Sequence, residues 1–222
     1  MTAAPAKTAV KSAPKPASWA YAEDFVAESE AAAEARAAAA PLGVTPLGRG
    51  AATALTVLAS LVRAKAVVEI GTGSGVSGLA LFAGMQPDGI LTSIDIEPEH
   101  QRAARKAFGS VGIPTQRFRL IAGAALNVLP RLSEGAYDLV FIDADKVEYP
   151  AYVEQGIRLL RSGGVLAVDN ALRRDRVADP SDDDDEVLAI RDALGMVADD
   201  ENLRPALLPV GDGLLVAVKL GG

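Results

Sequence analysis

Short apolar runs alternate with longer amphipathic segments through most of the chain. The runs are rich in Val, Ile and Leu, and several end at a glycine or an acidic residue, which is typical of buried strands in a parallel sheet. Strands are expected at residues 67–70, 90–95, 118–122, 137–142 and 165–168. Helices are expected at residues 98–108, 124–132, 149–160 and 182–197, with Gly163-Gly164 closing the third. This alternation predicts a doubly wound α/β fold.

Two further apolar runs, at residues 204–210 and 214–220, close the sequence. The tripeptide Gly-Asp-Gly at residues 211–213 joins them, and such a short glycine-bearing link is typical of a β-hairpin. A closing hairpin makes the last strand antiparallel. We therefore expect a mostly parallel, seven-stranded sheet with a C-terminal antiparallel hairpin.

The N-terminal part of the chain has a different composition. Residues 1–17 contain almost no large apolar side chains, so burial cannot offset the entropy of ordering them, and a disordered tail is expected. An alanine-rich helix capped by Ser18 is expected at residues 19–40, and a second helix at residues 51–63. After the tail we expect a single domain, residues 18–222, composed of N-terminal helices (18–64) and a core (65–222).

Charge and composition exclude several classes of protein. The 222 residues carry a net charge of −7, so the positive charge that general nucleic-acid or anionic-membrane binding requires is missing. No apolar run is long enough to span a bilayer. The absence of cysteine excludes disulfides and cysteine-ligated zinc, and it is compatible with the cytoplasm, the expected location. His100, the only histidine, is expected to be exposed at the start of a helix.

A glycine-rich turn follows the first predicted strand, where residues 67–78 read VVEIGTGSGVSG. Glycine admits positive φ, and a helix N-terminus offers free N–H groups, so the turn suits a nucleotide-like molecule. It fits a dinucleotide fingerprint with Asp95 as the ribose acid, and equally the S-adenosylmethionine (SAM) motif of a methyltransferase. Glu69 favours the methyltransferase, because a carboxylate there would repel a pyrophosphate but not a cationic sulfonium.

Further polar groups follow the later strands. Asp143 comes directly after the fourth predicted strand, and Asp169 and Asn170 come after the fifth. Ligands of an open α/β sheet bind outside the carboxyl ends of its strands, so we expect these side chains at the same edge as Asp95. Oxygen-only ligation suits Mg²⁺ or Ca²⁺. The group therefore predicts a divalent metal site beside the turn.

The residues around Asp143 and Asp169 carry a more specific signal. Phe-Ile-Asp-Ala-Asp-Lys at 141–146 and Val-Asp-Asn at 168–170 closely resemble the metal-dependent O-methyltransferases of the catechol and caffeoyl-CoA type. The glycine-rich turn, Ser-Ile-Asp at 93–95 and the final hairpin extend the likeness to about residues 44–220. The resemblance implies a Rossmann-like methyltransferase fold and a homodimer. It also implies metal-assisted methyl transfer from SAM to a hydroxyl of a catechol-like small molecule.

The resemblance also implies roles for individual residues. Lys146 matches the family's catalytic lysine, and Asp143 stands beside it in the catalytic set. The metal, with Mg²⁺ expected and Ca²⁺ or Mn²⁺ as alternatives, would be held by Asp143, Asp169 and Asn170. The residues expected to contact SAM are Glu69, Gly71, Thr72, Gly73, Ser77, Asp95, Ala125 and Asp143.

Two alternative functions and two departures from the family remain. An NAD(P)-dependent oxidoreductase could use the same turn, although it leaves Asp169 and Asn170 unexplained. A non-catalytic SAM-binding protein would bind SAM without turnover. The segment from Pro46 to Ala51 is slightly longer than in relatives, and Arg173 and Arg174 stand where relatives often carry tryptophan and glycine. In the family both regions border the acceptor pocket. Either one of the two arginines selects an acceptor with an anionic tail, or both are solvated and balance nearby acidic residues.

Overall fold

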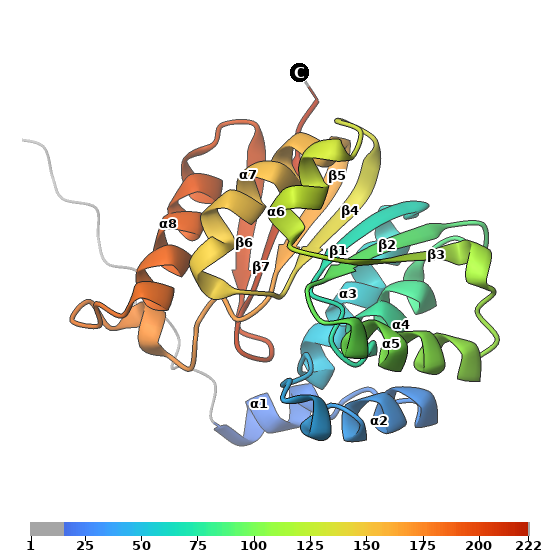
Figure 1. Cartoon of the computed structure of the whole chain (residues 1–222). Helices are drawn as coiled ribbons and strands as arrows, with labels where there is room; N and C mark the ends of the chain where they lie inside the picture. The colour runs from blue at the N-terminus through green and yellow to red at the C-terminus, as the bar shows by residue number, and fades with distance from the viewer. Residues whose placement is uncertain (1–15, 222) are drawn as a thin grey trace, which may run out of the picture.

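The structure is a computed structural model that describes residues 16–221, and it contains one seven-stranded sheet between two layers of helices (Figure 1). The strands are β1 (Ala66–Ile70), β2 (Ile90–Asp95), β3 (Phe118–Ala122), β4 (Tyr137–Ile142), β5 (Leu160–Val168), β6 (Leu203–Leu208) and β7 (Leu214–Lys219). The bounds of β2, β3 and β4 are those predicted, because turn residues flank each of these apolar runs on both sides.

The strand order is β3-β2-β1-β4-β5-β7-β6. Strands β1 to β5 pair in parallel, and β7 is antiparallel to both β5 and β6. The predicted fold class and C-terminal hairpin are thereby confirmed. From β1 the chain first builds outward through β2 and β3, and then returns to β4 on the other side of β1. The loops after β1 and β4 therefore diverge, which opens a crevice where doubly wound sheets bind ligands.

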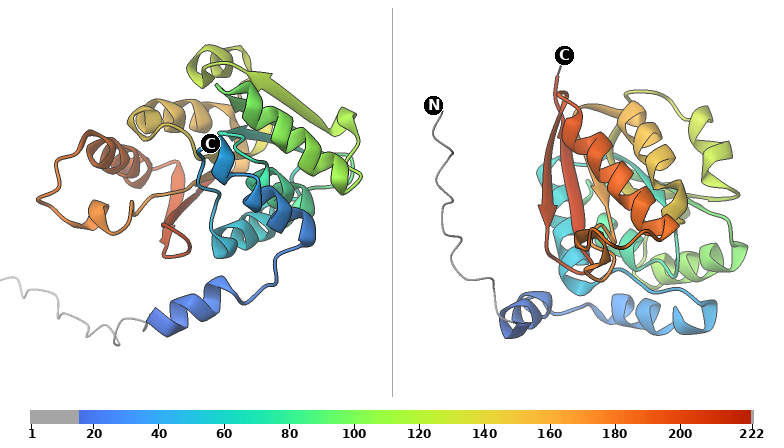
Figure 2. Two further views of the ribbon diagram at one scale, coloured as in Figure 1. Left: turned by 60° about the horizontal axis from the view of Figure 1, so that its bottom comes forward. Right: turned by 90° about the vertical axis from the view of Figure 1, so that its left-hand side faces the viewer.

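The helices are α1 (Pro16–Glu23), α2 (Glu30–Ala37), α3 (Arg49–Leu61), α4 (Val76–Gly84), α5 (Pro98–Ser110), α6 (Ala125–Val128), α7 (Tyr149–Leu159) and α8 (Asp185–Asp199). One face of the sheet is covered by α3, α4 and α5, which bury Leu55, Leu81 and Phe108. The other face is covered by α6, α7 and α8 (Figure 2), with Tyr149 and Ile190 in its core. Within residues 16–221, none of the helices combines the length and hydrophobicity that a membrane crossing needs.

The single helix predicted at residues 19–40 is wrong, because the structure has two helices there. Helix α1 ends at Glu23, and α2 begins after Ser29, whose side chain caps it. The Glu23 carboxylate accepts the backbone N–H groups of Gly50 at 2.8 Å and Gly211 at 2.6 Å. These tertiary hydrogen bonds fix the chain where the alanine-rich sequence alone favours a continuous helix.

Two predicted boundaries beside these helices are also wrong. Ser18 lies inside α1, which begins at Pro16, so it is not the N-cap and residues 16–17 of the predicted tail are helical. The rest of that tail lies outside the described residues. Gly163 and Gly164 lie within β5 and do not close α7, because Leu160 already pairs with Tyr137 of β4 directly after the helix.

Candidate active site

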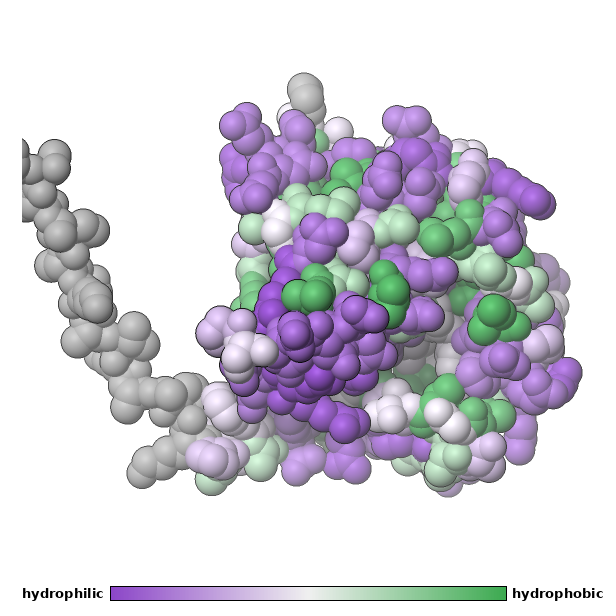
Figure 3. Space-filling view, turned by 60° about the vertical axis from the view of Figure 1, so that its left-hand side comes forward, coloured by the Kyte–Doolittle hydropathy of each residue, from purple (hydrophilic) through white to green (hydrophobic). Residues whose placement is uncertain are grey.

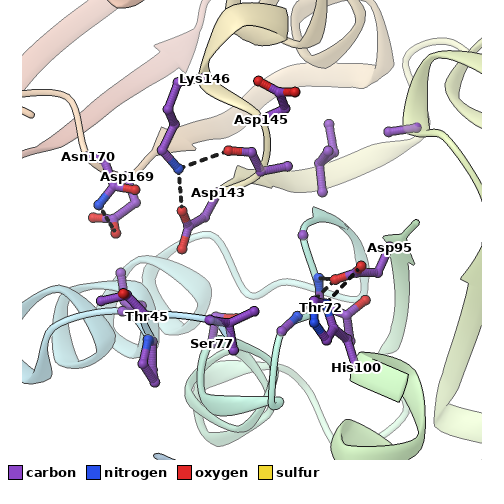
Figure 4. A pocket seen from close by; sticks show the side chains of 18 of the residues that line it. Thr45, Thr72, Ser77, Asp95, His100, Asp143, Asp145, Lys146, Asp169 and Asn170 are labelled. Atoms are coloured by element: carbon purple, nitrogen blue, oxygen red, sulfur yellow. Dashed lines mark hydrogen bonds and ion pairs between the residues drawn. The ribbon is translucent and has the colours of Figure 1, made fainter. Parts of the chain in front are cut away.

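A cavity of about 750 Å³ lies at the carboxyl ends of the parallel strands. The loops that follow β1, β2, β4 and β5 all contribute to it, and residues 44–48, ahead of α3, close its opposite side. The predicted site residues that line it are Gly71, Thr72, Gly73, Ser77, Asp95, Ala125, Asp143, Lys146, Asp169 and Asn170. Figure 4 shows two polar ends, one with Asp143, Lys146, Asp169 and Asn170 and the other with Thr72, Asp95 and His100.

Three glycines of the turn after β1 have positive φ, for different reasons. At Gly71 an added Cβ would lie 1.9 Å from the carbonyl oxygen of Asp143, so glycine lets the ends of β1 and β4 approach. At Gly75 the Cβ would lie 2.8 Å from Cα of Ala104 in α5. At Gly73 it would meet nothing within 4 Å, because this residue faces the open cavity. Gly73 thus leaves backbone accessible to a ligand.

The carboxylate of Asp95 is held by four hydrogen bonds. Oδ2 accepts the backbone N–H groups of Thr72 at 2.9 Å and Gly73 at 3.0 Å. Oδ1 accepts the N–H of Glu97 at 2.9 Å and lies 3.0 Å from Nδ1 of His100. Because an ionised carboxylate only accepts, Nδ1 of His100 carries the proton. The predicted ribose acid is therefore built into the glycine turn from both sides.

His100 is not the exposed histidine that its sequence context predicts. Only 13 % of its side chain is accessible, and it lines the cavity between Asp95 and the N-terminal segment. Its Nε2 lies 3.5 Å from the carbonyl oxygen of Leu42. His100 lies in the first turn of α5, five residues after Asp95. The helix therefore begins close enough to the end of β2 for the ring to reach the Asp95 carboxylate.

Glu69 lies behind the cavity wall and is fully buried. Its carboxylate accepts the hydroxyl groups of Ser77 at 2.6 Å and Ser93 at 2.5 Å, and Ser93 also contacts the hydroxyl of Thr72 at 2.6 Å. Burial raises the pKa of Glu69 to about 7, although both serine bonds oppose the shift. Glu69 is thus placed to fix the side chains of Ser77 and Thr72, which do line the cavity.

Lys146 and Asp143 occupy the other end of the cavity. Nζ of Lys146 donates to Oδ1 of Asp143 and to the carbonyl oxygen of Ala144, each at 2.9 Å. Nζ also lies 5.1 Å from the ring centroid of Tyr149, which is buried beneath it. The carboxylate of Asp143, the carbonyl of Ala144 and the tyrosine ring hold the ammonium group at the loop that follows β4.

Asp169 and Asn170 bring a second carboxylate towards Asp143. Oδ2 of Asp169 accepts from Nδ2 of Asn170 at 3.1 Å, while Oδ1 is buried and has no hydrogen-bond donor among the described residues. Burial raises the pKa of Asp169, and the charge of Asp143 raises it further. A buried carboxylate oxygen without a donor, beside a second carboxylate, is a site that a cation would satisfy.

The donor set fits an oxygen-preferring divalent cation. In the part of the chain that the structure describes, no three His, Cys, Asp or Glu side chains cluster as metal ligands. The predicted set has only two such residues, Asp143 and Asp169, and takes the amide of Asn170 as its third ligand. Carboxylate and amide oxygens are ligands for Mg²⁺ or Ca²⁺, which fill their remaining positions with water or substrate oxygens.

Several residues of the cavity carried no signal in the hydrophobic pattern of the sequence, although the family resemblance already placed Pro46 to Ala51 beside the acceptor pocket. Residues 44–48 form a wall although their sequence, Val-Thr-Pro-Leu-Gly, is that of an ordinary loop. Glu148 and Tyr152 also line the cavity, and the hydroxyl of Tyr152 donates a hydrogen bond to the carboxylate of Glu148. Asp212, in the turn between β6 and β7, also lines the cavity although it lies far along the chain from the other residues. These residues come from connections whose positions depend on tertiary packing, so periodicity alone does not reveal them.

Arg173 and Arg174 both line the cavity, but they differ in their partners. The guanidinium of Arg173 is paired with Glu186 of α8, whereas Arg174 is exposed and its backbone N–H donates to Asp212. Arg174 is therefore the one whose side chain can reach a ligand without breaking an ion pair. Figure 3 brings forward the side of the molecule that carries the loop after β5, to which both arginines belong. A dense hydrophilic cluster borders a hollow there.

Comparison with protein-family models identifies the chain. Residues 22–220 match the model described as O-methyltransferase. A protein of Mycobacterium tuberculosis named as a probable O-methyltransferase is 51 % identical over 201 residues, which are 90 % of each chain. A protein of Mycobacterium ulcerans with a similar name is 50 % identical over 200 residues, 90 % of this chain and 89 % of the relative.

Solved structures show the same architecture. A protein of Corynebacterium glutamicum has a TM-score of 0.84 at 32 % identity, covering 91 % of this chain and 95 % of its own. The O-methyltransferase TomG of Streptomyces achromogenes, in complex with SAM, has a TM-score of 0.83 at 27 % identity, with 94 % and 100 % covered. The chain therefore belongs to the O-methyltransferase family, which confirms the SAM-dependent O-methyltransferase expected from its motifs.

Proposed function

We propose that this O-methyltransferase transfers the methyl group of SAM to one hydroxyl of a catechol-like acceptor, with a divalent cation at Asp143, Asp169 and Asn170. The observation that carries the proposal is the division of one cavity into two polar ends (Figure 4). One end has a glycine turn and a carboxylate, which suit a nucleoside. The other has two carboxylates, an amide and a lysine, which suit a cation and an ionising hydroxyl.

The first end would hold the cofactor. The open backbone at Gly73 and the carboxylate of Asp95 offer contacts to the ribose, and Ala125 offers an apolar surface to the adenine. Ser77 and Thr72, fixed by the network around Glu69, offer hydroxyl groups to the methionine part. In this arrangement the sulfonium would lie on the side of the cavity that carries Asp143. The TomG complex with SAM supports the choice of cofactor.

The second end would hold the acceptor. A cation bound by Asp143, Asp169 and Asn170 would supply a positive charge that lowers the pKa of the reacting hydroxyl. The dication would favour loss of the proton that Lys146 carries, and the neutral amine, with its Nζ beside Asp143 at the cavity surface, would then take the proton of that hydroxyl. The oxygen then forms a bond to the methyl carbon as the carbon–sulfur bond breaks, which leaves S-adenosylhomocysteine. Holding both reactants in one cavity supplies much of the rate.

The metal requirement can be tested separately from SAM binding. The purified enzyme, stripped with a chelator, is assayed with SAM and a catechol at increasing Mg²⁺, alongside Asp169→Asn. We expect activity to be lost in chelator and restored by Mg²⁺, and the variant to need far more Mg²⁺. SAM affinity, measured by calorimetry, should change little in the variant. Full turnover in excess chelator would overturn the metal site while leaving the methyltransferase assignment intact.

The two alternative functions are set aside by the family that the chain belongs to. Residues 22–220 of this chain match an O-methyltransferase model, which argues against an NAD(P)-dependent oxidoreductase. A non-catalytic SAM-binding protein is not supported either, because the relatives are named as methyltransferases. Calorimetry with SAM, NAD⁺ and NADP⁺ checks the cofactor directly, with binding of SAM alone as the expected result.

We further propose a cytoplasmic homodimer that binds neither nucleic acid nor membranes. The net charge of −7 supports the absence of nucleic-acid binding, and the lack of cysteine suits the cytoplasm. Trp19, Tyr21 and Phe25, at the N-terminal helix, are all about half exposed or more, and such an apolar group favours a protein contact. Sedimentation of the wild type and of Phe25→Glu tests this, with a dimer expected for the first and a monomer for the second.

A further inference from the structure

The carboxylate of Asp95 has no free capacity for a ribose. Its two oxygens offer roughly four lone-pair sites, and four donors already occupy them: the N–H groups of Thr72, Gly73 and Glu97, and the ring of His100. A ribose hydroxyl that donates to Asp95 must therefore share or replace one of these bonds. Which donor can leave is decided by how each of them is held.

Three of the donors belong to the backbone. Thr72 and Gly73 lie in the turn after β1, which is fixed by the hydrogen bond from Gly71 N–H to the carbonyl of Ile94 at 2.9 Å. Glu97 is two residues from Asp95 and directly precedes α5. Moving any of these groups displaces the end of a strand or the start of a helix. Of these four donors, only His100 donates from a side chain, and that side chain can rotate about its Cα–Cβ and Cβ–Cγ bonds.

His100 also has little to lose on the far side of its ring. Its Nε2 lies 3.5 Å from the carbonyl oxygen of Leu42, at the outer limit of a hydrogen bond. The ring lines the same cavity as Asp95, so it stands in the space from which a ribose would approach. Figure 4 shows His100 and Asp95 together at that end of the cavity.

We propose that His100 occupies the ribose-binding side of Asp95 in the cofactor-free enzyme and leaves it when the ribose of SAM binds. The inference rests on the proposed role of Asp95 in holding that ribose. When His100 leaves, its 3.5 Å approach to the carbonyl oxygen of Leu42 is lost as well, and this opposes the movement little.

His100 provides its own spectroscopic probe because the chain contains no other histidine. Protein labelled with ¹⁵N in the histidine ring gives one pair of ring-nitrogen signals. We expect the hydrogen-bonded Nδ1–H signal to be replaced on saturation with S-adenosylhomocysteine, and to persist with its 2′,3′-dideoxy analogue. An unchanged Nδ1–H signal in saturating S-adenosylhomocysteine would overturn the exchange.

Affinity gives a second, independent test. His100→Ala removes the competing donor, so it should bind S-adenosylhomocysteine about five- to ten-fold tighter than wild type. The gain should vanish with the dideoxy analogue. Arg102→Ala, an exposed change on the same helix, should leave both affinities unchanged. Equal or weaker binding by His100→Ala would show that His100 only positions Asp95.

The two proposals fail in different ways. If Asp95→Ala binds S-adenosylhomocysteine as tightly as wild type, the ribose role of Asp95 is wrong, and the exchange falls with it. If Asp95→Ala binds weakly while the His100 signal does not change, the ribose role stands and the exchange alone is wrong.

Discussion

The ammonium nitrogen of Lys146 lies 2.9 Å from Oδ1 of Asp143, and both side chains enter the cavity from the loop that follows β4. The pair stands where a hydroxyl of the acceptor would lose its proton in the proposed reaction. In the same loop, Asp145 turns away from the cavity centre and caps the next turn through the N–H of Val147. Neighbouring residues of one short loop therefore have different roles: Lys146 faces the proposed reaction, and Asp145 stabilises the backbone.

Replacing Lys146 should remove turnover without removing cofactor binding. Lys146→Ala is expected to lower kcat by about 10²- to 10⁴-fold, because a positioned proton acceptor contributes that much. The SAM dissociation constant, measured by calorimetry, should stay near wild type. Lys106→Ala provides the matched control, since this exposed lysine of α5 lies outside the cavity. Wild-type kcat in Lys146→Ala would remove the lysine from the mechanism.

Glu69 should make the enzyme less stable as the pH rises towards neutrality. Its pKa is about 7 in the folded chain against an ordinary value of 4.5, so the folded state holds the proton more tightly. The resulting stabilisation is complete below about pH 4.5 and is lost as the pH rises through about 7. Relative to Glu69→Gln, the wild type should lose on the order of 3 kcal/mol of unfolding free energy over this range.

Urea unfolding of both proteins at pH 5, 6, 7 and 8 measures that difference. The comparison with Glu69→Gln cancels the contributions of other groups, including Asp169, whose pKa is also raised. If the two stability curves run parallel, Glu69 is charged throughout and its serine bonds outweigh burial.

Gly73 and Gly135 form a matched pair for testing the glycine turn. Both have positive φ (49° and 62°), and at both an added Cβ would meet nothing within 4 Å. Alanine at either position should therefore cost about 1–2 kcal/mol of stability through backbone strain alone. Only Gly73 lies in the cavity, so only Gly73→Ala should also weaken SAM binding. Equal SAM affinities in the two variants would show that the cofactor does not approach Gly73.

Arg174 should favour acceptors that carry a negative charge. Its side chain is exposed at the cavity, whereas Arg173 is already paired with Glu186. A catechol acid should have a higher kcat/KM than its neutral amide, and Arg174→Ala should reduce that preference about two- to five-fold. Arg173→Ala is the control and should leave the preference intact. Equal use of acid and amide by the wild type would end the idea.

The sequence predicted the sheet well because the strand signals are local. Each central strand is a short apolar run that ends at a turn residue, and β2, β3 and β4 have the predicted bounds. The polar residues at the strand ends were predicted to meet, and the structure places Asp95, Asp143 and Asp169 around one cavity. Parallel strands impose this, whatever the loops do.

What could not be predicted depends on contacts between distant residues. The break between α1 and α2 follows from Glu23, which accepts the N–H of Gly211, 188 residues further along the chain. The partial burial of His100 goes with its hydrogen bond to Asp95, a contact that the pattern of the sequence does not reveal. Glu69 was expected to contact SAM, and the sequence did not reveal that its carboxylate is buried against Ser77 and Ser93. That burial depends on the packing of β1 against β2.

The wall formed by residues 44–48, together with Arg174 and Asp212, comes entirely from connections outside the sheet. The half of the cavity proposed for the nucleotide, by contrast, lies at the ends of the central strands. The sequences of the two halves can therefore diverge among relatives at different rates. A relative could change its acceptor by exchanging three surface loops, while the machinery that handles the methyl donor is inherited unchanged. Loop grafting between relatives is accordingly the natural route to new acceptor specificities on this scaffold.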